Sequence, residues 1–282
     1  MDTPIRAIGR RGGGKGMTCT LHITAALRAG ITYLRHSYCT RPFKVANIRE
    51  DRAALQLPLV IMSASPGMLD GDVYHWKIEV EAGAHLLLQT QSYQRLFTMQ
   101  QGAHQRIDVE VASGAALHYL PHPTVPQAAA VFEGHTHIHL QENAHLLWSE
   151  IITCGRKLNG EVFAFTRFHS TTEVRWKNKL VLRENTWLEP QRWSLPGMGQ
   201  LETYTHQASL FCFDEQLDMN ALADALHEMF AMEERIATGV SRTAHHGLML
   251  RFLGQGGEQL QTMIARAAAL VAGMREGVNI LK

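Results

Sequence analysis

Apolar and polar residues alternate with a period of two over most of this chain. From Thr18 to about Glu215, runs rich in Val, Thr and aromatic residues are separated by turn-forming residues. This alternation is typical of half-buried β-strands. We therefore predict a mainly-β body over residues 18–215, in which one of the predicted strands covers residues 160–168.

A strand pair recurs about every 30 residues within this body. The three copies are residues 80–88 (VEAGAHLLL), 111–119 (VASGAALHY) and 140–148 (LQENAHLLW). Gly83, Gly114 and Asn143 occupy the turns, at spacings of 31 and 29 residues, and both residue types tolerate a positive φ. We interpret residues 48–57, with Arg52 at the turn, as a degenerate fourth copy. A fixed period of this length indicates stacked units, so we predict a β-solenoid or β-helix-like stack of strands.

Two helices are predicted near the C-terminus. Asp218 is a suitable N-cap for the first, and the second begins near Glu258 with a long apolar stripe. Residues 247–253 between them are predicted to form a strand. Residues 1–17 are predicted to be a flexible tail, because they are rich in Gly and Arg. The remaining residues 18–282 are predicted to form a single domain, with a β body (18–215) and a cap of one strand and two helices (216–282).

Composition excludes several classes of function. The chain has 282 residues, of which 45% are hydrophobic, and this is enough for a real core. A net charge of +1, without Lys/Arg clusters beside aromatic residues, argues against a nucleic-acid partner. No apolar run is long enough to cross a membrane, and no secretory signal is visible. The four scattered Cys residues lack a CxxC pair, so we expect free thiols, no structural zinc site and a cytoplasmic location.

Residues 62–72 (MSASPGMLDGD) resemble a loop of the UreD/UreH family of urease accessory proteins. Further similar segments follow the family order from about Thr18 to Val271. They are residues 41–43 (RPF), 78–84 (IEVEAGA), 90–92 (TQS), 120–121 (LP), Glu150 with 155–156 (GR), 160–163 (GEVF) and 251–253 (RFL). The chain departs from the family pattern at Gly67-Met68, Gln89, residues 95–97 and His118, which indicates a divergent branch.

The resemblance implies a non-catalytic role in urease maturation. Members of this family act as scaffolds with a helical partner, UreF, and a GTPase, UreG, and the complex docks on apo-urease. The GTPase supplies nickel, and the UreD/UreH protein passes it on through an internal water-filled channel. The family fold is a β-solenoid-like stack with two helices, in agreement with the repeat. The resemblance therefore implies no tightly bound cofactor, only nickel in transit.

Carboxylates at or near the family motifs are the candidates for a nickel conduit. A conduit must not trap its cargo, and three or four His or Cys ligands would bind Ni²⁺ tightly. Isolated carboxylates suit the task better, and the candidates are Asp72, Glu150, Glu161 and Glu184. The alternative is structural: Asp72 caps its turn, Glu161 faces solvent, and Glu150 and Glu184 form surface ion pairs. We favour a conduit role for at least one of Asp72 and Glu150, since the apolar residues 146–148 before Glu150 indicate partial burial.

A second pattern with metal-binding chemistry is His135-Thr-His137-Ile-His139. On a strand these three imidazoles point to one face, about 6–7 Å apart, and pairs of them could hold a metal ion. The alternative is the polar outer face of a strand whose Ile138 faces inwards. A competing function is thus a metal-dependent hydrolase that uses these His residues with Glu133, and a third is an interaction module without a metal role. No GxSxG or HExxH motif is present. The sequence favours the non-catalytic scaffold.

Overall fold

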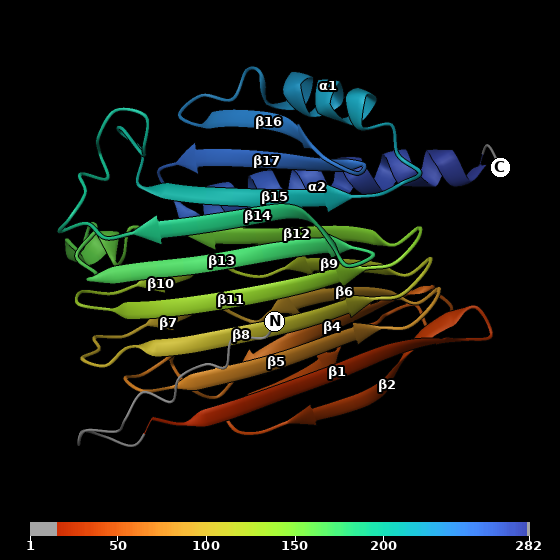
Figure 1. The fold of residues 1–282 in the computed structure, drawn as a ribbon, viewed down its shortest axis with the longest axis horizontal. Helices are drawn as coiled ribbons and strands as arrows, with labels where there is room; N and C mark the ends of the chain where they lie inside the picture. The colour runs from red at the N-terminus through yellow and green to blue at the C-terminus, as the bar shows by residue number, and fades with distance from the viewer. Residues whose placement is uncertain (1–15, 281–282) are drawn as a thin grey trace.

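The computed structural model describes residues 16–280 and the side chains up to residue 277. Two β-sheets face each other, and two helices cover the outer face of one of them (Figure 1). The predicted mainly-β fold with two helices near the C-terminus is thereby confirmed. The predicted flexible tail, residues 1–17, lies outside the described residues except for its last two positions.

Sheet A has seven strands in the order β14-β13-β11-β8-β5-β1-β2. Their bounds are Thr18–Arg28 (β1), Ile31–Cys39 (β2), Val73–Val80 (β5), Ala103–Val111 (β8), Val131–Leu140 (β11), Arg167–Trp176 (β13) and Lys179–Leu188 (β14). β14 is one edge of this sheet, and β13 pairs with it as an antiparallel hairpin.

Sheet B has the strand order β16-β17-β15-β12-β9-β6-β4-β3, with the short strands β7 and β10 beside it. The bounds are Phe43–Asn47 (β3), Gln56–Ser63 (β4), His85–Thr90 (β6), Gln94–Leu96 (β7), Ala116–Leu120 (β9), Thr124–Pro126 (β10), His145–Ile152 (β12), His206–Phe213 (β15), Ala237–Thr243 (β16) and Gly247–Gly254 (β17). The helices are α1 (Met219–Phe230) and α2 (Gly257–Ile280), and a short 3₁₀ turn covers Lys157–Asn159. No helix in the described part of the chain is long and apolar enough to cross a membrane.

Successive copies of the repeat lie side by side in both sheets. In sheet B, His85 pairs with Ala116 and Ala116 with His145, which are offsets of 31 and 29 residues between parallel strands. β5, β8 and β11 of sheet A pair in parallel in the same way. The chain therefore alternates between the sheets once per repeat, and the strands of each copy stack on those of the previous one (Figure 1).

The turns of the three copies have the backbone conformation that their residue types allow. Gly83, Gly114 and Asn143 have φ values of 70°, 66° and 54°. The fourth copy is only half formed. β4 stacks in parallel on β6, but the turn at Arg52 belongs to an antiparallel connection within sheet B rather than to a crossing between sheets.

Two apolar cores hold the layers together. The larger lies between the two sheets, and the second lies between sheet B and the helices. β12 contributes to both, because Leu146 and Trp148 face sheet A while Leu147 and Ile151 face the helices. Asp218 caps α1 by accepting hydrogen bonds from the backbone of the first turn, as predicted. All four cysteines are free thiols.

The predicted strand at residues 160–168 is wrong over most of its length, because β13 begins only at Arg167. Gly160 and Phe163 have positive φ values, and the amide of Phe163 donates to the carbonyl of Cys154. The aromatic side chain of Phe165 is buried in the larger core, so these aromatic residues anchor a loop rather than alternate along a strand. β16, which the sequence did not predict, extends sheet B beyond β17.

A buried cluster of ionisable groups joins sheet B to α2. His145 Nδ1 lies 2.8 Å from Asp214 Oδ2, and Arg275 Nε of α2 lies 3.0 Å from the same oxygen. Neither contact with this oxygen is aligned as a hydrogen bond. His145 Nε2 is 2.9 Å from His118 Nε2. Burial lowers the pKa of His118 to about 3 and that of His85 to about 4, and it also lowers the pKa of His145.

These buried imidazoles predict a loss of stability in mild acid. Their pKa values in the folded chain lie below the ordinary value of about 6.5. The unfolded chain therefore binds more protons than the folded chain as the pH falls from about 6.5 towards 4, and the free energy of unfolding decreases over this window. Urea unfolding followed at several pH values checks this expectation. An His118→Gln variant should lose part of the pH dependence, and an unchanged slope would contradict the assignment.

Candidate functional site

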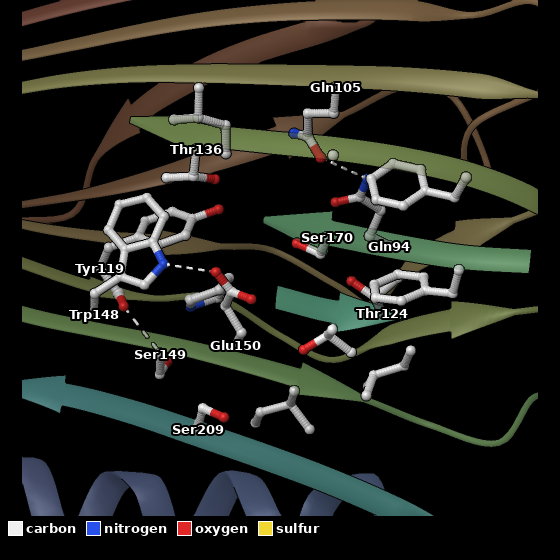
Figure 2. A pocket seen from close by; sticks show the side chains of 18 of the residues that line it. Gln94, Gln105, Tyr119, Thr124, Thr136, Trp148, Ser149, Glu150, Ser170 and Ser209 are labelled. Carbon is white, nitrogen blue, oxygen red and sulfur yellow. Dashed lines mark hydrogen bonds between the residues drawn. The ribbon is translucent and has the colours of Figure 1, made fainter. Parts of the chain in front are cut away.

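A polar cavity lies inside the molecule, between the two sheets. This central cavity has a volume of about 90 Å³ and is bordered mainly by inward-facing residues of β8, β11, β12, β13 and β15. Its polar lining includes Gln94, Gln105, Thr136, Ser170 and Ser209 (Figure 2). A space of this size with several polar groups can hold a few water molecules.

Glu150 of β12 is the carboxylate of the central cavity. Its Oε1 accepts a hydrogen bond from Thr172 Oγ1 at 2.5 Å. It accepts another from Trp148 Nε1 at 3.1 Å (Figure 2). Both donors are neutral, and no ion pair to Glu150 is formed among the described residues. Burial raises the pKa of Glu150, the two hydrogen bonds oppose the rise, and the carboxylate of Glu184 adds to it. The structure therefore holds an acidic group in the interior without a cationic partner.

Two polar rows face each other across the interior at this point. In sheet A, register places Thr136 beside Thr172 and Thr172 beside Glu184. In sheet B, register places Glu150 beside Ser209 and Ser209 beside Arg251. The rows are joined by the bond from Thr172 to Glu150 and by a bond from Arg251 Nη2 to Glu184 Oε2 at 2.6 Å. A polar band thus crosses the core from the central cavity towards the edge strand β14.

The band ends at an open groove with a volume of about 470 Å³. We call it the edge groove; it is lined by Glu184 and its neighbours on β14, by residues of β16 and β17, and by the loop that carries Trp193. Glu184 is buried and Arg251 is half exposed. Burial raises the pKa of Glu184, and the charge of Arg251 opposes that rise. Thr186 and Gln207 line both the edge groove and the central cavity, so the two spaces adjoin.

A third, smaller space adjoins the central cavity on the other side. This loop cavity has a volume of about 60 Å³ and is lined by Phe43, by Tyr74 and by residues of the loop 63–68. Thr90 and Gln94 line both the loop cavity and the central cavity. Three adjoining spaces therefore run through the interior from the loop 63–68 to the edge groove.

Asp72 lies in a turn rather than on any of these three spaces. Its Oδ2 accepts a hydrogen bond from the Leu69 amide, and its Oδ1 accepts one from the Met17 amide, both at 2.8 Å. The side chain is buried, at 4% exposure. Asp72 therefore has the contacts of a structural residue: it caps its turn and attaches the start of β1 to that turn.

Replacing Asp72 with Ala is expected to lower the stability of the protein without a specific loss of metal handling. Two backbone amides would lose the buried carboxylate that accepts their hydrogen bonds, which costs about 1–3 kcal/mol. Urea unfolding measures this loss. The control is Asp51→Ala, which removes an exposed turn bond to the Ala53 amide and should cost less. If Asp72→Ala unfolded at the wild-type urea concentration, its assignment as a buried turn cap would be incorrect.

Glu161 also lies away from these three spaces. Its Oε2 accepts a hydrogen bond from Arg156 Nε at 2.9 Å and another from the Ala128 amide at 3.3 Å. The hydrogen bond with Arg156 lowers the pKa of Glu161. Its contacts are those of a loop ion pair, and Glu161 does not line the three spaces.

The three His residues of β11 lie on the outer face of sheet A. His135, His137 and His139 are partly exposed, whereas Ile138 and Leu140 between and after them are buried. His135 contacts Glu133, and His137 lies 3.9 Å from Glu173. Among the described residues, no group of three or more His, Cys, Asp and Glu side chains is placed to hold a metal ion.

Sequence reasoning missed most of the residues around Glu150. Thr172 and Ser209 are ordinary strand residues in the sequence, and nothing in their local pattern separates them from outward-facing Thr and Ser. Arg251 stands in a family-like segment, but its partner Glu184 is 67 residues away. Only the register of β12, β13, β15 and β17 brings these side chains together.

Comparison with known proteins agrees with the sequence resemblance. A family model described as "UreD urease accessory protein" matches residues 17–279. A urease accessory protein UreD of Flavobacterium johnsoniae is 39% identical over 261 residues, which cover 92% of this chain and 94% of that protein.

Two further relatives carry the same name. One from Acetivibrio thermocellus is 35% identical over 250 residues, covering 88% of this chain and 95% of that protein. One from Haemophilus influenzae strain PittEE is 34% identical over 256 residues, covering 86% of this chain and 94% of that protein. The match spans both sheets and both helices, so the chain belongs to the UreD family of urease accessory proteins, which are not enzymes.

Proposed function

We propose that this protein is a scaffold for urease maturation that passes nickel through the row of spaces between its sheets. The observation that carries the proposal is the position of Glu150, a partly buried carboxylate between the sheets, beside a polar cavity and with neutral hydrogen-bond donors only. An interior carboxylate without a counter-charge is costly to ionise, and a divalent cation offers the missing charge.

The chemistry of this passage suits transit better than storage. The carboxylates near it are Glu150 and Glu184, and neither belongs to a group of three metal-binding side chains in the described chain. Burial raises the pKa of Glu150, so its carboxylate holds a proton more firmly than an exposed carboxylate does. A proton therefore competes with a cation at Glu150 more strongly than at an exposed carboxylate, and this competition weakens the retention of the cation. The central cavity can supply water as the remaining ligands.

The partners belong to the same proposal. We propose that the chain works with the helical protein UreF and the GTPase UreG, and that the complex docks on apo-urease in the cytoplasm. Residues 18–282 would act as one β-solenoid-like domain, with nickel as cargo and no resident cofactor. The parallel stacking of successive repeats supports this description of the fold.

The hydrolase alternative has no support. The family consists of accessory proteins rather than enzymes. The side chains of His135, His137 and His139 form a row along the outer face of sheet A, beside Glu133 and Glu173 rather than around a shared site. A pure interaction module remains the contrasting hypothesis, and it predicts that urease maturation does not depend on Glu150.

The first experiment produces urease from its gene cluster with and without this chain. We expect urease that assembles but stays poor in nickel and inactive without the chain, and full nickel content when the chain is restored. Nickel per urease active site and urease activity are the two readouts. Urease that is equally loaded and active without the chain would overturn the maturation role.

A further inference from the structure

A positively charged side chain lies at the edge groove, the wider end of the proposed passage. A path for cations would not be expected to hold such a charge. Arg251 of β17 extends from the inner face of sheet B, in register with Ser209 beside Glu150. Its Nη2 lies 2.6 Å from Glu184 Oε2 of β14, in the opposite sheet. Both residues line the edge groove. A fixed positive charge at this point would repel a divalent cation.

The two partners differ in how firmly they are held. Glu184 is buried, with 10% of its side chain exposed, whereas Arg251 has 50% exposed. Arg251 therefore has water nearby that can replace its hydrogen bond to Glu184, whereas Glu184 is shielded from solvent. A half-exposed guanidinium can keep its charged head in water, and its long aliphatic stem allows the head of Arg251 to move away from Glu184.

The carboxylate that Arg251 covers belongs to the interior band. Glu184 is in register with Thr172, which donates a hydrogen bond to Glu150. The negative charge of Glu184 also raises the pKa of Glu150, so the two groups interact electrostatically. Without Arg251, two acidic groups would share a poorly hydrated interior. A pair of this kind would hold a divalent cation more firmly than either group alone.

We propose that Arg251 is the exchangeable counter-charge of Glu184, which covers this carboxylate in the empty passage and gives way to a passing divalent cation. The inference rests on the proposed function and adds to it a residue that keeps the passage from retaining its cargo. Borderline divalent cations such as Ni²⁺ are the expected class. As the cation leaves Glu184, the guanidinium returns and completes the release.

The test compares Ni²⁺ retention by full-length, untagged protein in equilibrium dialysis. Arg251→Met leaves Glu184 without a counter-charge, so we expect the affinity for one nickel ion per chain to rise about tenfold over wild type. Arg251→Lys keeps the charge and should behave like wild type. The double variant Arg251→Met/Glu184→Gln removes the uncovered carboxylate and should return to the wild-type affinity. If Arg251→Met does not fold, Arg251→Gln serves the same purpose, because it keeps a hydrogen-bond donor without the charge.

A merely structural ion pair between the sheets gives a different result. In that case Arg251→Met and Glu184→Gln would both lower the urea midpoint, and nickel retention would stay at the wild-type value in every variant. This outcome would overturn the proposed exchange. A different result would show that nickel does not pass through the interior at all. In that case the nickel content of urease would be unchanged by Glu150→Gln as well.

Discussion

Replacing Glu150 with Gln is expected to reduce the nickel content of urease matured with this protein by about tenfold or more, while the protein stays folded. The amide keeps an acceptor for Thr172 and Trp148, so the local hydrogen bonds persist. It removes the negative charge that would stabilise a divalent cation in the central cavity. At an effective dielectric constant of about 20, the attraction between unit charges 4 Å apart is about 4 kcal/mol, and a tenfold effect needs only about 1.4 kcal/mol.

The matched control for this change is Glu161→Gln. Glu161 is also a carboxylate in a family-like segment, but it pairs with Arg156 in a loop away from the cavities. We expect wild-type nickel content with this variant. Urea unfolding of both variants separates folding from transfer, and Glu150→Gln should stay close to wild type in stability because the amide keeps an acceptor for both hydrogen bonds. Normal nickel loading of urease with Glu150→Gln would show that Glu150 takes no part in nickel transfer.

Replacing Asp214 with Ala is expected to cause the largest loss of stability among the variants considered, about 3–5 kcal/mol. Asp214 is 4% exposed, and its Oδ2 contacts both His145 of β12 and Arg275 of α2. Its Oδ1 accepts a hydrogen bond from the Gln216 amide at 2.7 Å. The Ala variant would leave the guanidinium of Arg275 without its counter-charge beneath the helix. Burial acts to raise the pKa of Asp214, but its contacts with His145 and Arg275 hold the value below the ordinary one.

The control for Asp214 is the nearby Asp218→Ala. Asp218 is an exposed N-cap that accepts hydrogen bonds from Asn220 and Ala221, and its loss costs about 0.5–2 kcal/mol. Urea unfolding of the two variants at neutral pH should therefore give clearly different midpoints. If both variants lost the same small amount, the buried cluster would contribute little to the attachment of α2.

The architecture could be predicted from the sequence because its signals are local and repeated. Gly83, Gly114 and Asn143 mark turns that the structure places between the two sheets, and Asp218 marks the start of α1. The loop around Phe163 could not be predicted in this way. Its aromatic residues resemble a strand, but its conformation depends on contacts with Cys154 and the core.

The candidate passage could be predicted only in part, for a related reason. Glu150 follows the apolar residues 146–148, and this context distinguishes it from a surface carboxylate. Asp72 and Glu161 stand in equally family-like segments, yet their contacts are a turn cap and a loop ion pair. Position in a motif does not reveal which way a side chain faces. That information comes from strand register, which is set by distant parts of the chain.

The measurement that tests the central claim most directly is the nickel content of urease matured with a partly filled cavity. Ser170 of β13 lines the central cavity, so Ser170→Leu narrows the passage without changing any charge. The adjacent His169 contacts Asn185 on the outer face of sheet A, and His169→Leu is the control. Co-purification with the partner proteins establishes that both variants still assemble. We predict nickel-poor urease with Ser170→Leu and fully loaded urease with His169→Leu, and full loading with both would contradict an interior route for nickel.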